Sequence, residues 1–299
     1  MSALPRQIAG IYSGGSGTWT IQFPEDLKRS DVRMVDTIDP VVTPFGKSGP
    51  IKLLDVAGAP VLRFGMHGWH RDEKGKPVPT WRCSWQIAWI AQEVDAQWAV
   101  IEGSVGGIQN PDKLGEPLPP WSVVVLDDYI MHWVPPDELP AIINGDQPFP
   151  RMREPFCTDV RMHLAAAARE EERFTVFGHG VYVTTPLGRF ETDAEIHMMA
   201  GWGAHVVGQT AGHEIAVFKQ VGLHIGHLSI VSNHAEDRSK PWVGDDGPGA
   251  MAQFYDECAE PMGNVMADAM VAIVEQGIGE CHCGAYQNVG LRAFPIDNA

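Results

Sequence analysis

Two histidines that follow an expected strand could bind an anion or a sugar. Residues 61–71, VLRFGMHGWHR, form an apolar run that stops at Gly65 and opens into a loop with His67 and His70. Loops at strand ends commonly hold ligands in α/β proteins. The residue before His67, where an anion site would gain most from a cation, is Met66. The segment therefore predicts an anion site that keeps a histidine and lacks the neighbouring positive charge.

A glycine-rich turn near the N-terminus could hold a phosphate group. The residues GGSG at 14–17 offer backbone N–H groups and the hydroxyl of Ser16, which together can bind phosphate oxygens. No lysine follows as in a P-loop, and the G-x-G-x-x-G spacing of a dinucleotide site is absent. By itself the segment is better explained as a tight structural turn.

In the second half of the chain, three residues could together bind a flat heterocycle. Phe190 could stack on a ring, a contact that contributes roughly 1–3 kcal/mol with a nucleobase, and Glu191 could accept hydrogen bonds from ring N–H groups. The amide of Asn233 both donates and accepts, which suits the N7 edge of a purine. Each also has a structural interpretation, because Glu191 or Thr192 could cap a helix and Asn233 could end a turn.

The five cysteines do not form a recognisable metal site in the sequence. Three of them are isolated and are interpreted as buried thiols of a reduced compartment: Cys83, Cys157 and Cys258. Cys281 and Cys283 form C-H-C, but zinc would need two further ligands, and only His282 lies close. We therefore expect no metal here, and interpret the pair as local thiols or a strained disulfide. His224 and His227 are interpreted as ordinary sheet residues.

The elements that must position these residues alternate between strands and helices. Apolar runs predict strands at 8–17, 97–108, 121–130, 174–185, 204–210 and 224–233, and a hairpin at 52–65. Helical spacing predicts helices at 81–94, 157–172, 192–203 and 212–223, and a long one within 247–277. This alternation predicts one α/β domain over residues 1–299, with a central twisted, mixed, largely parallel sheet flanked by helices.

Four expected strand ends carry small or polar residues. They lie at 14–17, 65–68, 102–107 and 231–233. In open α/β sheets the ligand binds at the carboxyl ends of the strands. We therefore expect these four ends to border one pocket.

Composition excludes several classes of partner. Hydrophobic residues make up 44% of the chain and charged residues 20%, as in a globular protein with a core. The net charge of −16 argues against nucleic acid and anionic membranes, which both need clustered Lys and Arg. The first twenty residues lack the basic start and apolar run of a secretory signal, so we expect a cytoplasmic protein.

Taken in chain order, these motifs resemble the 5′-methylthioadenosine phosphorylase and trimeric purine nucleoside phosphorylase family. The similarity covers nearly the whole chain and is most specific at 181–223. Further matching segments are GGSG at 14–17, TPFGKSGPI at 43–51, GMHGWH at 65–70, EGSVGGI at 102–108, MREPFC at 152–157 and SNHAED at 232–237. The C-H-C also has a counterpart in the C-x-C of many methylthioadenosine phosphorylases.

This resemblance implies phosphorolysis, in which a purine nucleoside and phosphate give the free purine and a sugar 1-phosphate. It implies no metal or organic cofactor, with inorganic phosphate as co-substrate. Family members of this size are usually homotrimers in which a neighbour's loop completes each pocket. The resemblance thus implies a purine-salvage transferase of the pentosyltransferase class.

The resemblance also assigns roles to individual residues. It implies phosphate-site positions for Ser16, Met66, His67 and Thr210, with Met66 in place of the family's arginine. It implies substrate-binding positions for Phe190, Glu191, Gln209 and Ala235, where Gln209 replaces a methionine under the ribose and Ala235 an acidic residue. It implies catalytic positions for Asn233, which faces N7, and for His67. The asparagine resembles 6-oxopurine enzymes, whereas MREPFC and C-H-C resemble the methylthioadenosine branch, so the base preference stays open.

Two departures from the family keep other functions open. The missing arginine removes a charge-assisted bond of roughly 1.5–3 kcal/mol, which Arg63, Arg71 or another subunit's arginine could replace. Glu102 places a carboxylate near the expected phosphate. Besides a phosphorylase with a remodelled phosphate site, the sequence therefore allows a nucleoside hydrolase in which Glu102 activates water. It also allows a non-catalytic binder of flat aromatic ligands.

Overall fold

The computed structural model describes residues 4–66, 69–133, 150–239 and 249–283. Within them, one mixed sheet of 11 strands has the order β10-β8-β13-β7-β1-β6-β5-β2, and a second branch of β12, β11 and β9 joins it at β7. The strands of this sheet are β1 (Gly10–Gly14), β2 (Val32–Ile38), β5 (Ile51–Val56), β6 (Ala59–Gly65), β7 (Trp98–Gly107), β8 (Ser122–Val125), β9 (Asp128–Met131), β10 (Thr175–Phe177), β11 (Val181–Thr184), β12 (Val206–Gly208) and β13 (His224–His234). A separate small ribbon pairs β3 (Val42–Thr43) with β4 (Gly46–Lys47).

Parallel strands form the centre of the sheet, where β6, β1, β7 and β13 lie side by side. Antiparallel strands β5 and β2 extend one edge, and β8 joins the other edge antiparallel to β13. Of these strands, β1, β7 and β13 are almost entirely buried, as expected for strands covered on both faces. The mixed, largely parallel sheet that the sequence predicts is confirmed.

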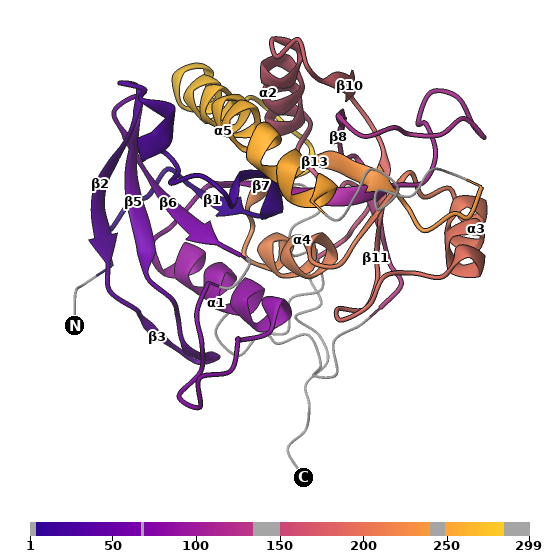
Figure 1. The fold of residues 1–299 in the computed structure, drawn as a ribbon. Coiled ribbons are helices and arrows are strands. Elements are labelled where there is room, and N and C mark those ends of the chain that lie inside the picture. The colour runs from indigo at the N-terminus through magenta and orange to yellow at the C-terminus, as the bar shows by residue number, and fades with distance from the viewer. Residues whose placement is uncertain (1–3, 67–68, 134–149, 240–248, 284–299) are drawn as a thin grey trace.

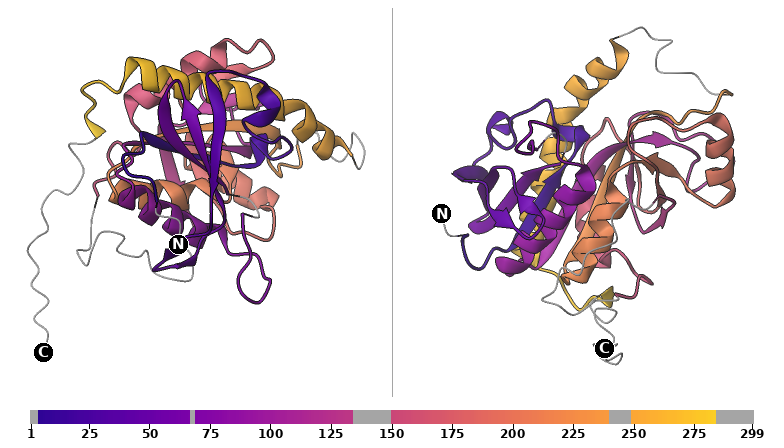
Figure 2. Two further views of the ribbon diagram at one scale, coloured as in Figure 1. Left: turned by 90° about the vertical axis from the view of Figure 1, so that its left-hand side faces the viewer. Right: turned by 90° about the horizontal axis from the view of Figure 1, so that it is seen from below.

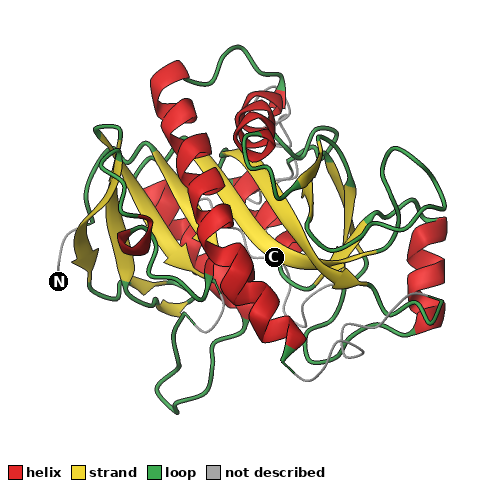
Figure 3. Ribbon diagram, turned by 45° about the horizontal axis from the view of Figure 1, so that its top comes forward, coloured by secondary structure: helices red, strands yellow, loops and turns green. Residues whose placement is uncertain are grey.

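Helices cover both faces of this sheet (Figures 1 and 2). On one face lie α1 (Thr80–Glu93) and α4 (Ala211–Gln220), and on the other lie α2 (Thr158–Arg169) and the long α5 (Ala250–Gln276). Figure 3 shows α5 crossing the sheet and α3 (Asp193–Gly201) standing apart at the end of the second branch. Two short 3₁₀ turns complete the described elements, η1 (Ser16–Thr18) and η2 (Glu25–Leu27).

The packing of α5 shows why this segment is helical. Cys258, Met262, Met266 and Met270 recur every four residues and are all fully buried against the sheet. This spacing places one apolar stripe on one face of a helix. The described helices lie where the sequence predicts them, although α4 is buried on all sides and α3 buries only Ile196 and Met199.

Two expected strands each divide in two. The run at 121–130 becomes β8 and β9, and the run at 174–185 becomes β10 and β11. The breaks face each other, since the N–H of Gly180 donates to the Asp127 carboxylate at 2.9 Å. The first halves of the two divided strands, β8 and β10, pair with each other, and the second halves, β9 and β11, also pair with each other. The paired breaks let both chains pass from the main sheet into the second branch.

Two further differences concern strands. The strand end expected at 102–107 is itself part of the strand, because β7 continues to Gly107 and pairs there with β13 and β12. The edge strand β2 was not expected from the sequence. No helix in the described ranges combines the length and apolar character that crossing a bilayer requires.

Candidate active site

A cavity of about 260 Å³ lies at the carboxyl ends of the central strands. Seventeen residues line it: Ser16, Trp19, Ser104, Val105, Gly106, Phe190, Glu191, Val207, Gly208, Gln209, Thr210, Ser232, Asn233, Ala235, Glu236, Met251 and Tyr255. Three of the four predicted strand ends thus meet at this cavity. At the fourth, Met66 is 2% exposed, lies in the core, and donates its N–H to the Gly14 carbonyl at 2.8 Å. His67 lies outside the described residues.

The predicted heterocycle-binding residues come together at this cavity. Phe190 is 66% exposed, so its ring is available for a ligand. Thr192 caps α3 in a capping box with Glu195, which leaves Glu191 free to line the cavity. Glu191 is held by the hydroxyl of Thr185, which donates to its carboxylate at 2.5 Å.

A β-bulge directs Asn233 into the cavity. The register between β13 and β7 shifts between Val231 and Asn233, and bulges of this kind re-aim side chains near functional sites. The Ser232 hydroxyl donates to Oδ1 of Asn233 at 2.8 Å, and Nδ2 donates to the His234 carbonyl at 2.7 Å. The amide is therefore fixed, with one N–H and one lone pair left for a ligand.

The other predicted substrate and phosphate residues lie on the same wall. Gln209 lines the cavity and donates to the Arg189 carbonyl at 2.7 Å. Thr210 is the N-cap residue of α4, and its N–H donates to the Tyr182 hydroxyl at 3.2 Å. Ala235 is buried and also lines the cavity.

The glycine-rich turn is built around the carboxylate of Glu102. The N–H groups of Gly15 and Gly17 donate to it at 2.6 and 3.0 Å, and the Thr18 hydroxyl donates at 2.7 Å. These N–H groups were expected to face a phosphate, and in the structure an internal anion occupies them. Only Ser16 of the turn lines the cavity.

Two buried carboxyl groups lie beneath the turn. Glu102 is 2% exposed, and burial raises its pKa while the nearby Arg63 opposes the rise. Glu214 of α4 accepts a hydrogen bond from the Ser13 hydroxyl at 2.5 Å. Burial, and next the charge of Glu102, raise the pKa of Glu214 to about 8. At neutral pH, Glu214 is therefore mostly protonated.

Hydroxyl groups replace cations on the cavity wall. Ser16 and Ser104 lie 2.6 Å apart, and Ser104 lies 2.8 Å from the Tyr255 hydroxyl. None of the described lining residues is Lys or Arg, whereas Glu191 and Glu236 are both present. Burial, and next the charge of Glu191, raise the pKa of Glu236.

Neither Arg63 nor Arg71, which could have replaced the family's phosphate-binding arginine, lines this cavity. The Arg63 guanidinium lies 5.5 Å from the ring centre of Tyr12 and 5.3 Å from that of Phe23, beneath the turn. Arg71 donates to the carbonyl of Gly75 in an exposed loop at 2.8 Å. A cation for the cavity does not come from either of them.

Sequence reasoning missed the side of the cavity formed by α5. Tyr255 and Met251 come from the first turns of this helix, and Trp19 follows η1. The rings of Trp19 and Tyr255 meet edge to face, with their centres 5.3 Å apart. The sequence gives no local signal for this wall, because the helix was recognised only by its buried face.

A second group of side chains lies at the other end of β13. The ligand atoms of Cys157, His224, Cys281 and Cys283 all lie within 4.8 Å of one another. The expectation that only His282 could join the C-H-C cysteines is wrong, because the fold brings two distant ligands to them. His282 itself is exposed.

Comparisons with known proteins agree with this architecture. Residues 84–275 match the family model of the phosphorylase superfamily. A probable S-methyl-5′-thioinosine phosphorylase of Methanosarcina acetivorans is 31% identical over 198 residues, which are 66% of this chain and 69% of the relative. A 6-oxopurine nucleoside phosphorylase of Pyrococcus furiosus is 28% identical over 238 residues, 76% and 79% of the two chains.

A third relative and a solved structure extend this similarity. An S-methyl-5′-thioadenosine phosphorylase of Prochlorococcus marinus is 26% identical over 226 residues, which cover 74% of this chain and 65% of that one. The crystal structure of a methylthioadenosine phosphorylase from an antarctic soil metagenomic library superposes with a TM-score of 0.72. It is 20% identical and covers 95% of this chain and 92% of that one. At this identity the superposition shows a shared fold.

Proposed function

Because this chain belongs to the phosphorylase superfamily, we propose that it cleaves the N-glycosidic bond of a purine nucleoside with phosphate. The products are the free purine and a ribose 1-phosphate, with a 5′-methylthio nucleoside as the favoured substrate. One observation carries the proposal, namely that Phe190, Glu191 and Asn233 line a single cavity at the carboxyl ends of β7 and β13. The named relatives and the structure quoted above are all phosphorylases, which favours this reaction over the hydrolase and binder alternatives.

The purine lies against Phe190 with its N7 edge toward Asn233. When the bond between C1′ and N9 breaks, its electron pair moves onto the purine, and N7 takes up a proton from solvent water, which neutralises the developing charge. The free lone pair of Asn233 Oδ1 accepts a hydrogen bond from that N7 proton. Because neighbouring groups already hold the amide, its orientation does not have to be established during the reaction.

The phosphate approaches C1′ from the hydroxyl-lined wall. One phosphate oxygen forms the new bond to C1′ as the bond to N9 breaks. Ser16, Ser104 and Thr210 line this wall and can donate hydrogen bonds to the other oxygens. An arginine at this site would form a charge-assisted hydrogen bond with phosphate that contributes roughly 1.5–3 kcal/mol. Without this arginine, phosphate binds about 10 to 100 times more weakly.

The wall formed by Trp19, Met251 and Tyr255 suits an apolar substituent on the ribose. A 5′-methylthio group would bury its methyl and sulfur there, where a 5′-hydroxyl gains little. Inorganic phosphate is the co-substrate, and no organic cofactor is part of the proposal. The assembly is proposed to be a homotrimer in the cytoplasm.

Release of the free base from four nucleosides tests this function. The protein is incubated with methylthioadenosine, methylthioinosine, inosine and guanosine, each with and without phosphate. We expect release only with phosphate, fastest with a methylthio nucleoside, and a sugar 1-phosphate as the second product. Equal release without phosphate would overturn the proposal, as would binding of all four nucleosides without release.

A further inference from the structure

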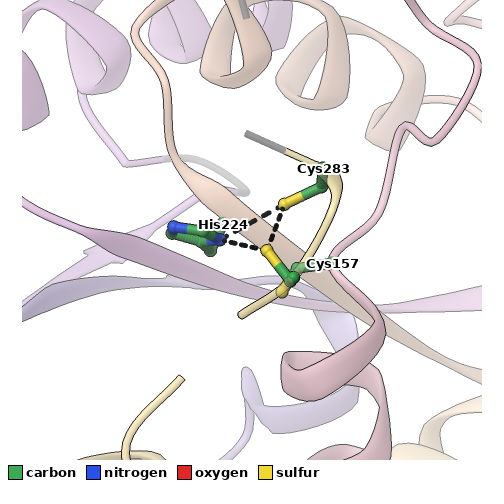
Figure 4. Close-up of side chains that lie close together, drawn as sticks. Cys157, His224 and Cys283 are labelled. Atoms are coloured by element: carbon green, nitrogen blue, oxygen red, sulfur yellow. Dashed lines mark hydrogen bonds between the residues drawn. The ribbon is translucent and has the colours of Figure 1, made fainter. Parts of the chain in front are cut away.

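Four possible metal ligands from three distant segments converge at the amino end of β13. Cys157 precedes α2, His224 begins β13, and Cys281 and Cys283 follow α5. Nδ1 of His224 lies 3.1 Å from Sγ of Cys281 and 3.2 Å from Sγ of Cys283, and the two Sγ atoms lie 3.0 Å apart. Figure 4 shows Cys157, His224 and Cys283 pointing toward one another.

Hydrogen bonds to backbone groups hold these segments together independently of the sulfur atoms. The N–H of Cys157 donates to the carbonyl of Ile225 at 2.8 Å, which fixes this cysteine beside His224. Lys219 donates both to the carbonyl of Cys283 and to that of Glu154, each at 3.0 Å. The four ligands are therefore positioned by the fold before any ion binds.

The charge of Lys219 points to an anionic centre at this place. This side chain is 1% exposed, and it donates hydrogen bonds to two neutral carbonyl groups. None of the lysine ion pairs in the described part of the chain includes Lys219. A buried ammonium is costly unless negative charge lies nearby.

We propose that Cys157, His224, Cys281 and Cys283 bind one Zn²⁺ in a tetrahedral site with three sulfur ligands and one nitrogen ligand. On binding, three thiols release their protons to solvent and the imidazole stays neutral, with no change in oxidation state. Three thiolates around a dication carry a net charge of about −1, which the buried Lys219 ammonium balances. Thiolate ligands select zinc over magnesium or calcium.

The geometry requires small movements of the side chains. Zinc–sulfur bonds of about 2.3 Å place tetrahedral sulfur atoms about 3.8 Å apart. The sulfur atoms of Cys281 and Cys283 lie 3.0 Å apart, so they separate by less than about 1 Å, within the reach of rotamer adjustment. All four positions are filled by protein groups, which is typical of a structural site.

The position of the group also assigns it a structural role. His224 and Asn233 lie nine residues apart on one strand, which places them about 30 Å apart at roughly 3.3 Å per residue. The ion therefore does not touch the reacting atoms. It fastens the segment after α5 to the start of α2 and to the start of β13.

Metal analysis of the full-length protein tests the site. The chain is purified under mild reductant from zinc-supplemented cells, and zinc is measured per chain by mass spectrometry. We expect one zinc per chain, and a loss of at least about 10-fold in zinc affinity for His224→Ala and for Cys283→Ser. The control Cys83→Ala, at a buried cysteine of α1, should keep its zinc.

Cobalt binding to the unaltered apoprotein keeps the proposal testable if the variants do not fold. Stoichiometric Co²⁺ should give intense tetrahedral d–d bands and a thiolate charge-transfer band, and zinc should bleach both. Zinc should also raise the melting temperature of the apoprotein. Zinc-free reduced protein without a cobalt spectrum would overturn the proposal. So would a thiol titration showing that Cys281 and Cys283 remain a disulfide under these conditions.

Discussion

The carboxylate of Glu102 accepts a hydrogen bond from the backbone N–H of Gly15 at 2.6 Å. A glycine-rich turn of this kind can bind the oxygens of a soluble anion. Here the anion is part of the chain, and Gly17 and Thr18 bind it as well. The turn is thus permanently ordered around a side chain that a ligand cannot displace without cost.

Replacing Glu102 by glutamine should destabilise the fold. Four donors converge on the carboxylate, and an amide would present its own N–H₂ group to at least one of them. An unsatisfied buried group costs about 1–3 kcal/mol. Urea unfolding of Glu102→Gln measures this cost, with the exposed Glu93→Gln as the control. Equal stability of the two variants would mean that the buried group already acts as a neutral acid.

Replacing Glu102 by serine should strengthen phosphate binding. The change frees the N–H groups of Gly15 and Gly17 and removes a carboxylate from beneath the cavity. One charge-assisted bond of about 1.5 kcal/mol corresponds to roughly a tenfold change in affinity. We expect the phosphate KM of Glu102→Ser to fall about tenfold when it is assayed below its melting temperature. An unchanged or higher KM would place the phosphate away from this turn.

Asn233→Ala should reduce turnover far more than stability. Loss of one preorganised group at a developing charge costs about 10²-fold or more in kcat, whereas two lost hydrogen bonds cost about 1 kcal/mol each. The matched control is Ser232→Ala, which removes the bond to Oδ1 and keeps the amide. Steady-state kinetics and thermal melts separate the two effects. A fall in kcat that only parallels a large loss of stability would contradict the assigned role.

Phe190→Ala should weaken nucleoside binding without affecting the fold. The ring is 66% exposed and lines the cavity, so little packing is lost when it is removed. A stacking contact of roughly 1–3 kcal/mol predicts an increase in nucleoside KM of about 5- to 150-fold. Trp202, 46% exposed and outside the cavity, provides the control variant Trp202→Ala. Similar kinetics in both variants would exclude stacking on Phe190.

The stability of the fold should decrease as the pH rises toward 8. Glu214 has a pKa of about 8 in the folded chain, against an ordinary value of 4.5. Between these two values the folded state holds one proton more than the unfolded state, so raising the pH favours unfolding. The contribution is at most about 1.4 kcal/mol per pH unit, and it ends above about pH 8. Urea titrations from pH 5 to 9 should show this slope, and Glu214→Gln should lack it.

The sequence predicted most helices and central strands because they carry a local periodic signal, whereas the edge strand β2 was not expected. The buried stripe of α5 and the apolar runs of the central strands are visible without knowing their partners. The expected strand ends placed Asn233 at the cavity, near the carboxyl end of β13, and the family resemblance placed Phe190 at the same site. The division of the strands at 121–130 and 174–185 was missed, because the position of each break depends on contacts with the other strand.

Contacts between distant residues were the part that the sequence could not supply. Nothing near Glu102 shows that its side chain turns inward toward Gly15, more than eighty positions away. Likewise, Cys157 and His224 carry no local sign that the C-H-C cysteines will meet them. Such contacts depend on side-chain direction and on chain path, which periodicity does not encode.

The acidic rim of the cavity also sets which relatives of a nucleoside can enter. Glu191 and Glu236 line a cavity whose described wall carries no lysine or arginine. Nucleotides present the same base and ribose with additional negative charges, which these carboxylates repel at short range. Uncharged nucleosides are not repelled by these carboxylates. Because the described wall of the cavity lacks a cation, we expect it to bind mono-, di- and triphosphates of the same base more weakly than the uncharged nucleoside.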